Sequence, residues 1–200
     1  SDLKYNLENI LLASSIALEI GIQESSIEKG IRSCEYIDGR NENISQPEWP
    51  DIIIDYAHTP DAYTNMLSSI KEIYPDKKIK VLFGAGGNRD QSKRPEMARA
   101  VEKFADEAYL VPDNPRFEDI NKINNDVIIG FSKDIVQVFD NRENGLLAAL
   151  KSLDSNDILI IFGKGNEKFQ EINGEKLYYS DREIIEEFYA NWYYWNGFIY

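Results

Sequence analysis

The stretch Asp113-Asn114-Pro115-Arg116 places an acid, an amide and a guanidinium within four residues of one another. An Arg side chain binds a carboxylate through two parallel hydrogen bonds, and an Asp carboxylate accepts hydrogen bonds from an ammonium group. Together these groups suit a small zwitterion such as an amino acid. A plain turn is the competing interpretation, because an Asn-Pro pair favours a turn by itself.

Three other polar stretches resemble this one in their place relative to a strand. Each comes directly after an apolar run that predicts a buried strand. They are residues 55–58, 84–90 and 163–167, and the apolar runs before them are residues 52–54, 79–83 and 158–162. The carboxyl ends of parallel strands lie at one edge of a sheet, and open α/β sheets bind their ligands there. We therefore expect the four polar loops to face one crevice.

Two of these loops contain groups that suit a phosphate or a nucleotide. His58, the only histidine, stands just before a predicted helix, whose amino end would favour an anion. A histidine that only satisfies the turn is the simpler interpretation. Gly84, Gly86 and Gly87 allow a ligand to approach the backbone closely, although a flexible turn also explains them and they match no phosphate-loop pattern.

Cationic side chains near these loops have two interpretations each. Lys93 and Arg94 are most simply a solvated helix start, but cations are unfavourable at that end of a helix, so a nearby anion would help to explain them. The Gly-Lys-Gly stretch at residues 163–165 resembles half of a phosphate loop without the following Ser or Thr. Glu167 could accept an ammonium or could be an exposed loop acid.

The elements that position these loops follow from hydrophobic periodicity and helix-start signals. Two helices are predicted over residues 7–18 and 24–33, followed by a polar stretch at residues 41–50 that we take as a domain boundary. After it, short apolar runs alternate with amphipathic helices, and a capping box opens the last helix at Ser180. This alternation predicts an α/β fold with a Rossmann-like, mainly parallel sheet and helices on both faces.

The composition limits the class of protein. With 200 residues, 42% hydrophobic and 28% charged, the chain can form one core and a smaller segment. A net charge of -13 argues against a general nucleic-acid binder, and no apolar run is long enough to cross a membrane. No signal peptide opens the sequence and Cys34 has no second cysteine to pair with, so we expect a cytoplasmic protein. One His and one Cys are too few for a zinc site, and no metal ligand is assigned.

Taken in order, the motifs of this chain resemble those of the C-terminal domain of the Mur ligases over residues 5–189. The resemblance is carried by residues 55–62, 86–90, 93–95, 113–116, 163–165 and 179–182. It implies two parts: residues 1–46 are the helical end of the family's central ATPase domain with a linker, and residues 47–200 are the C-terminal amino-acid-binding domain.

The resemblance also implies an activity. Mur ligases consume ATP to activate a carboxylate as an acyl phosphate, which the amine of an incoming amino acid attacks. The motifs are most similar to those of members that add the third amino acid, expected to be meso-diaminopimelate, to UDP-N-acetylmuramoyl-L-alanyl-D-glutamate in peptidoglycan synthesis. ATP and Mg²⁺ would be bound mainly by parts of such a ligase that this chain lacks, so we expect the chain alone to be inactive. Its partners would be these small molecules, with no nucleic acid and no membrane.

Residue by residue, the resemblance implies two sets of contacts and assigns no catalytic residue to this chain. The set for the incoming amino acid is Arg89, Asp113, Asn114, Arg116, Gly163 and Glu167, with Asp113 as a buttress. The set for the nucleotide is Asn9, Arg40, Asp55 and His58. Arg116 would pair with the second carboxylate of diaminopimelate, which lysine lacks, and Glu167 would take the distal ammonium. Asn166 and Lys168 depart from the family, which commonly has His and an acid at these positions.

Three alternatives stay open. The chain could be a non-catalytic Mur-like module that binds a ligand or a partner, because it contains no phosphate loop. It could belong to a related ligase such as a folylpolyglutamate synthase, although Asp-Asn-Pro-Arg is not expected there. Lysine or the thioether lanthionine could also replace diaminopimelate as the third amino acid.

Overall fold

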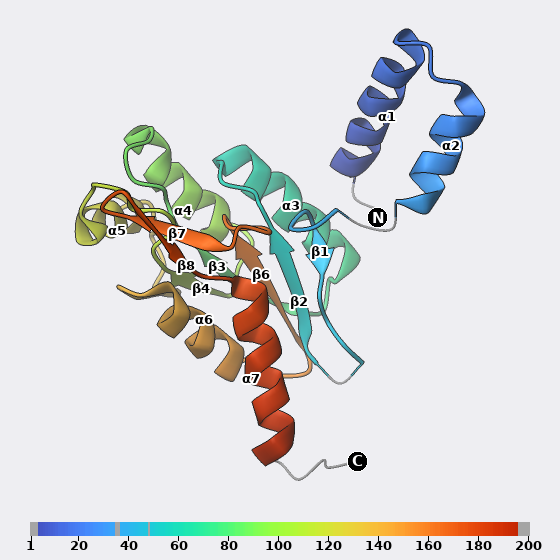
Figure 1. The fold of residues 1–200 in the computed structure, drawn as a ribbon. Helices are drawn as coiled ribbons and strands as arrows, with labels where there is room; N and C mark the ends of the chain where they lie inside the picture. The colour runs from blue at the N-terminus through green and yellow to red at the C-terminus, as the bar shows by residue number, and fades with distance from the viewer. Residues whose placement is uncertain (1–3, 35–36, 48, 196–200) are drawn as a thin grey trace.

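A mainly parallel sheet forms the centre of the computed structural model, which describes residues 4–34, 37–47 and 49–195 (Figure 1). Its strands are β1 Glu42–Asn43, β2 Asp51–Asp55, β3 Lys78–Phe83, β4 Glu107–Leu110, β5 Val136–Val138 and β6 Asp157–Phe162. They lie in the order β1-β2-β6-β3-β4-β5, and only β1 is antiparallel to its neighbour. A separate antiparallel hairpin consists of β7 Phe169–Ile172 and β8 Glu175–Tyr178.

Helices cover both faces of the six-stranded sheet. The helices of the described residues are α1 Lys4–Glu19, α2 Glu24–Ser33, α3 Pro60–Ile73, the short 3-10 helix η1 Gln91–Lys93, α4 Arg94–Glu102, α5 Ile120–Ile128, α6 Arg142–Lys151 and α7 Asp181–Trp195. One hydrophobic cluster joins a face of the sheet to α3, α4 and α5, and a second cluster joins the opposite face to α6 and α7. The predicted α/β fold with helices on both faces is confirmed.

Four parallel strands end at the same level. Asp55 is paired with Phe162 at the ends of β2 and β6, and Phe83 is paired with Leu110 at the ends of β3 and β4. Strands β3 and β6 are also neighbours in register. The loops that follow these strands therefore leave the sheet at one edge, as the sequence predicts.

Side-chain caps set where several of the helices begin, among them α3 and α7. Oγ1 of Thr59 accepts a hydrogen bond from the amide of Ala62 at 3.3 Å, and Pro60 occupies the first turn of α3. Oγ of Ser180 accepts a hydrogen bond from the amide of Glu183 at 3.3 Å, which is one of the two hydrogen bonds of the predicted capping box. The Glu183 carboxylate accepts instead from the hydroxyl of Tyr178 and from Lys168. Such caps fix the point at which the chain leaves a loop, and so they also fix the neighbouring loop residues.

The β7–β8 hairpin lies outside the elements predicted from the sequence. Its turn is Asn173-Gly174, with φ angles of 51° and 82°, and paired positive values are what one type of two-residue hairpin turn requires. The Asn-Gly pair was the signal that could have predicted it. β7 lies beside the loop after β4, where Arg116 and Ile172 form an isolated bridge.

Helices α1 and α2 form a pair beside the sheet (Figure 1). No residue of α2 is buried, and Leu7, Leu11 and Leu18 of α1 are exposed. β1 pairs with β2, so the sheet includes residues on both sides of the domain boundary predicted at residue 47, and the boundary itself stays a prediction. Among the described residues, no helix is long and apolar enough to span a membrane.

Candidate functional site

The loops after β3 and β4 contact each other through their backbones. The amide of Gly87 donates a hydrogen bond to the carbonyl oxygen of Asn114 at 2.9 Å. A Cβ atom on Gly87 would lie 1.9 Å from the carbonyl oxygen of Pro115, so only glycine allows this approach. The two loops therefore meet as expected. Their contact is possible because residue 87 is a glycine, which has no Cβ atom.

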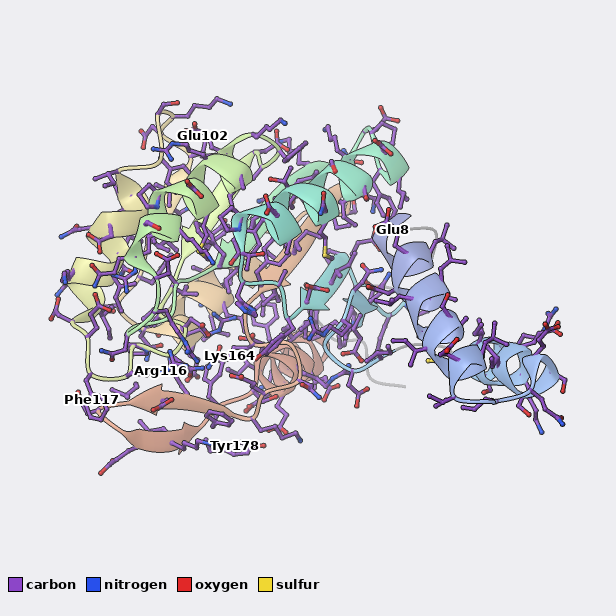
Figure 2. The ribbon with its side chains drawn as sticks, turned by 90° about the horizontal axis from the view of Figure 1, so that it is seen from above. Glu8, Glu102, Arg116, Phe117, Lys164 and Tyr178 are labelled. Carbon is purple, nitrogen blue, oxygen red and sulfur yellow. The ribbon has the colours of Figure 1, made fainter. Side chains whose placement is uncertain are left out.

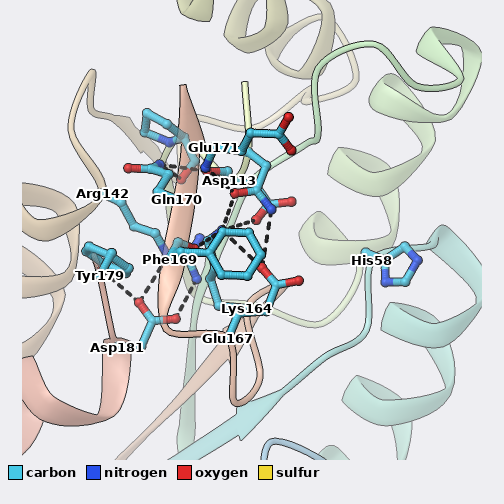
Figure 3. A network of polar contacts seen from close by, with 12 residues as sticks. His58, Asp113, Arg142, Lys164, Glu167, Phe169, Gln170, Glu171, Tyr179 and Asp181 are labelled. Atoms are coloured by element: carbon cyan, nitrogen blue, oxygen red, sulfur yellow. Dashed lines mark hydrogen bonds and ion pairs between the residues drawn. The ribbon is translucent and has the colours of Figure 1, made fainter. Parts of the chain in front are cut away.

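Five side chains form what we call the polar cluster, at the carboxyl ends of β4 and β6, and Figure 3 labels Asp113, Lys164 and Glu167 among them. Lys164 lies at its centre: its side chain is 0% exposed, and its ammonium is 3.2 Å from Glu167 Oε2 and 3.5 Å from Asp113 Oδ1. The ammonium also donates hydrogen bonds to Asn114 Oδ1 and, at 3.0 Å, to the carbonyl oxygen of Phe169. The members of the polar cluster are Asp113, Asn114, Arg116, Lys164 and Glu167.

The backbone on both sides of Lys164 directs its side chain inward. Gly163 and Gly165 have φ angles of 105° and 54°, values that L side chains rarely adopt. Burial lowers the pKa of the Lys164 ammonium, and the nearby Asp113 carboxylate opposes this change. The Gly-Lys-Gly stretch therefore does not present its lysine to a phosphate at the surface, because the lysine belongs to the protein interior.

Arg116 lies on the loop after β4, and strand β7 supports it. Figure 2 shows Arg116 and Lys164 on the side of the molecule that carries the β7–β8 hairpin. Nη1 of Arg116 donates a hydrogen bond to the carbonyl oxygen of Gly87 at 2.8 Å, and its Nε is 3.3 Å from Glu171 Oε2. Its guanidinium thus holds the loops after β3 and β4 and strand β7 together.

Arg89 comes from the loop after β3 and reaches the same place. A Cβ atom on Gly86 would lie 3.2 Å from Arg116 Nη1, 3.5 Å from Arg89 Cγ and 3.8 Å from Asp113 Oδ2. Three charged side chains from two loops therefore surround one point. Arg89 itself is exposed, so its guanidinium is accessible to a ligand.

A second region is a cleft of about 920 Å³ between the helical pair and the sheet. Its lining includes Asn9 of α1, Arg40, and Asp55 at the end of β2. Helices α2 and α3 complete the walls, mainly through apolar residues such as Ile27 and Met66. Volumes of this size are typical of small-molecule sites. Three of the four residues predicted to contact a nucleotide therefore share one cleft.

The backbone holds Asp55 in a fixed orientation at this cleft. Its Oδ2 accepts a hydrogen bond from the amide of Asn41 at 2.7 Å, and its Oδ1 accepts one from the amide of Ala57 at 2.7 Å. Burial raises the pKa of the Asp55 carboxyl, and these two hydrogen bonds oppose the rise. His58 is exposed at the start of α3, apart from the polar cluster (Figure 3), and its Nδ1 is 2.9 Å from the carbonyl oxygen of Tyr56.

Tyr56 connects the two regions. The guanidinium carbon of Arg40 is 4.6 Å from the centroid of the Tyr56 ring, a cation–π geometry. The hydroxyl of Tyr56 is 3.5 Å from Glu167 Oε1. One aromatic side chain thus reaches both the cleft and the polar cluster.

Arg94 is buried, so its interpretation as a solvated helix start is wrong. Its side chain is 1% exposed, and its guanidinium makes two hydrogen bonds with Glu118, at 2.8 and 2.7 Å, and one with Asp126 at 2.8 Å. The anion that explains a cation at this helix end is therefore supplied by the protein itself. Because Arg94 also donates to the carbonyl oxygen of Gly86 and Glu118 accepts from the amide of Asn88, this pair fixes the loop after β3.

The structure places the predicted site residues in two groups, and their binding roles stay predictions. The group at the polar cluster is Arg89, Asp113, Asn114, Arg116, Gly163 and Glu167. The group at the cleft is Asn9, Arg40 and Asp55, with His58 next to the lining residue Ala57. The roles of Tyr56, Arg94, Lys164 and Glu171 were not predicted. For Arg94, the sequence signal was a cation at an unfavourable helix end.

A family model described as the Mur ligase, glutamate ligase domain, matches residues 39–165. This chain belongs to the Mur ligase family. The matched part of this Mur ligase chain begins before β1 and ends after β6, so it includes Asp113, Asn114, Arg116 and Lys164 of the polar cluster.

Curated relatives and a solved structure extend the match over most of the Mur ligase chain. The UDP-N-acetylmuramoyl-L-alanyl-D-glutamate–2,6-diaminopimelate ligase of Buchnera aphidicola subsp. Baizongia pistaciae is 39% identical over 184 residues, which are 92% of this chain and 36% of the relative. The ligase of the same name from Chlorobaculum tepidum is 38% identical over 188 residues, which are 93% of this chain and 37% of the relative. A solved structure of a ligase of this name aligns with a TM-score of 0.73 and 30% identity over 95% of this chain and 39% of that chain. The chain therefore spans less than half the length of each.

Proposed function

We propose that this chain is the C-terminal part of an ATP-dependent ligase that adds meso-diaminopimelate to UDP-N-acetylmuramoyl-L-alanyl-D-glutamate in peptidoglycan synthesis. The observation that carries the proposal is the convergence of Arg116 and Glu167, from separate strand-end loops, on Asn114: Arg116 Nη1 is 3.4 Å from the carbonyl oxygen of Asn114, and Asn114 Nδ2 is 3.2 Å from Glu167 Oε2. The names of the relatives, which are 2,6-diaminopimelate ligases, support the choice of acceptor. The reaction forms an amide bond between the activated D-glutamate carboxylate and an amine of the amino acid, and phosphate leaves.

The incoming amino acid is positioned by groups of opposite charge. Arg116 pairs with the carboxylate at its distal end, and Glu167 Oε1 accepts a hydrogen bond from the distal ammonium. Asn114 directs its amide nitrogen to the same place as Glu167, at 3.2 Å from Glu167 Oε2. Holding the reacting amine at a fixed place lowers the entropic part of the barrier, and this is the contribution that the domain makes.

The cleft lined by Asn9, Arg40 and Asp55 suits a nucleotide. Its apolar walls can cover a base, the Asp55 carboxylate can accept from ribose hydroxyls, and the Arg40 guanidinium can pair with phosphate. Bound ATP supplies the phosphoryl group that activates the carboxylate. Among the described residues, no group of three or more His, Cys, Asp or Glu side chains could hold a metal ion by itself. Mg²⁺ would be held mainly by other parts of the ligase.

Calorimetric titration of the chain with meso-diaminopimelate and with L-lysine tests the proposal. We expect meso-diaminopimelate to bind more tightly, because only it offers Arg116 a second carboxylate. One charge-assisted hydrogen bond contributes about 1.5–3 kcal/mol, which corresponds to roughly a ten- to hundredfold difference in Kd. In Arg116→Ala, the two amino acids should bind with similar affinity.

Arg99→Ala is the matched control for this titration. Arg99 is exposed on α4 and does not belong to the polar cluster. Its substitution should therefore leave the preference for meso-diaminopimelate unchanged. Equal binding of the two amino acids by the unsubstituted chain, or binding of neither, would contradict the proposal.

Two other functions give different expectations. A non-catalytic Mur-like module would have no phosphate loop in its gene, so a G-x-x-G-K-[ST] motif encoded upstream of Ser1 would exclude it. A folylpolyglutamate synthase accepts glutamate, whose distal end is a carboxylate. That carboxylate could pair with Arg116, but glutamate brings no distal ammonium for Glu167 Oε1, and this disfavours the alternative.

A further inference from the structure

Lys164 belongs to the polar cluster but does not face a ligand. An ammonium has three hydrogen atoms to donate. Those of Lys164 are used by Asn114 Oδ1, by Glu167 Oε2 at 3.2 Å and by the carbonyl oxygen of Phe169 at 3.0 Å. With its side chain wholly buried and its donors used, Lys164 makes no direct hydrogen bond to a bound amino acid, and it acts by orienting its neighbours and through its charge.

These hydrogen bonds set the orientation of Asn114. Its Oδ1 accepts from Lys164 and, at 2.9 Å, from the amide of Glu171, so the oxygen side of the amide is occupied. The nitrogen side is then turned toward Glu167, where Nδ2 donates one hydrogen bond to Oε2 at 3.2 Å. The second hydrogen of Nδ2 is left for a ligand.

The same hydrogen bonds place the two carboxylate oxygens of Glu167 in different environments. Oε2 accepts from both Lys164 and Asn114, whereas among the described residues Oε1 has only the long contact of 3.5 Å with the hydroxyl of Tyr56. The Glu167 side chain is 21% exposed, so the cluster is open to a ligand on this side. Oε1 is therefore the acceptor available to a ligand ammonium.

We propose that Lys164 is a positioning residue that determines specificity. Its buried ammonium turns Asn114 Nδ2 and Glu167 Oε1 toward the ligand. This arrangement favours an amino acid whose distal end carries both a carboxylate and an ammonium. This inference rests on the proposed function of the chain and names the residue that selects the acceptor.

The charges around Lys164 explain the selection. Glu167 is already partly neutralised by Lys164, and Glu171 is paired with Arg116 at 3.3 Å. A lone distal ammonium, as in lysine, gains little from Glu167 and is repelled by Lys164 and Arg116. A carboxylate beside the ammonium is attracted to both cations, so the zwitterionic end of diaminopimelate is preferred.

Substitution of Lys164 in the complete polypeptide encoded by the gene that contains this chain tests the inference. The rate of ligation is measured at varied meso-diaminopimelate and at varied lysine. For Lys164→Met we expect the KM for meso-diaminopimelate to rise with little change in kcat. We also expect the ratio of kcat/KM for meso-diaminopimelate to that for lysine to fall by about tenfold, the loss of one charge-assisted interaction.

A second pair of variants separates positioning from folding. Lys164→Gln also removes the charge but keeps a donor, so it should lower the same ratio even if Lys164→Met does not fold. In a Glu167→Gln background, Lys164→Met should change the ratio much less, because Lys164 acts through Glu167. Lys168→Met is the matched control: Lys168 is 66% exposed and pairs with Glu183, and its loss should leave the ratio unchanged.

The outcomes distinguish the two proposals. Failure of the unsubstituted enzyme to ligate meso-diaminopimelate in preference to lysine overturns the proposed function, and this inference with it. Ligation with the expected preference, combined with an unchanged or raised ratio in the Lys164 variants, overturns the inference alone. Equal losses for both amino acids would show that Lys164 only supports the fold.

Discussion

Arg94 and Glu118 form an ion pair that fixes the loop after β3, and this pair makes the stability of the fold depend on pH. Hydrogen bonds from Arg94 lower the pKa of the Glu118 carboxyl from 4.5 to about 2. An acid whose pKa is lower in the folded state stabilises the fold above its unfolded pKa. That contribution is complete above pH 4.5 and is lost progressively as the pH falls to about 2.

Glu118→Gln should remove this part of the pH dependence, because the variant has no carboxyl to protonate. We expect the free energy of unfolding of the unsubstituted chain to fall more steeply than that of the variant between pH 4.5 and about 2. Urea titrations at a series of pH values measure both curves. Glu72→Gln, which changes an exposed acid on α3, should keep the unsubstituted slope. If the free energy of unfolding fell equally steeply with decreasing pH in Glu118→Gln and in the unsubstituted chain, the proposed dependence on the Glu118 carboxyl would be contradicted.

Between elements, the close approach of two strand-end loops builds the proposed amino-acid pocket. Gly87 on the loop after β3 lies against Pro115 on the loop after β4. The same contact carries the hydrogen bond from Arg116 to the carbonyl oxygen of Gly87. A residue that separates these loops should therefore affect both the stability of the fold and the position of Arg116.

Gly87→Ala should be destabilising and should weaken binding of the amino acid. Its new Cβ would lie 1.9 Å from the Pro115 carbonyl oxygen, so backbone must move. Overpacking of this kind costs about 1–3 kcal/mol. Chemical denaturation measures the cost, and calorimetry with meso-diaminopimelate measures the loss of affinity.

Gly30→Ala is the control for that substitution. A Cβ on Gly30, inside α2, would meet nothing within 4 Å. Alanine is the better helix former, so this variant should be more stable than the unsubstituted chain by about 0.5–1 kcal/mol and should bind the amino acid normally. Equal effects of the two substitutions would show that the contact between Gly87 and Pro115 is unimportant.

For the whole molecule, the helical pair and the sheet differ in how their residues are buried. Strand β6 is buried at all six of its residues, at the centre of the sheet. Helix α2 has no buried residue, and α1 exposes several leucines, among them Leu11 and Leu12 at 66% and 62%. Regions with few buried apolar contacts open at a lower free energy than the core.

Hydrogen exchange of the 200-residue chain should therefore be uneven. We expect amides of α1 and α2 to exchange much faster than those of β6, whose protection should match the global free energy of unfolding. Exchange measured by NMR or mass spectrometry at one pH gives both values. Equal protection of α2 and β6 would mean that the helical pair unfolds only together with the sheet.

Most elements of the fold, though not the β7–β8 hairpin, and the edge at which its polar loops meet could be predicted from the sequence. Helix starts such as Thr59 and Ser180 depend on hydrogen bonds to residues three positions away. Buried strands such as β6 are visible as short apolar runs. These features are local, so neighbouring residues contain the information. The order of motifs also allowed the family to be predicted, which the match over residues 39–165 confirms.

Only the tertiary structure decided where single polar side chains point. Arg94 is bound by Glu118, 24 positions away, and Lys164 by Asn114, 50 positions away, so no local pattern shows that either cation is buried. Likewise, Asn9 and Asp55 share a cleft only because the helical pair lies beside the end of β2. Burial and pairing depend on which distant segments pack together, and that is settled when the whole chain folds.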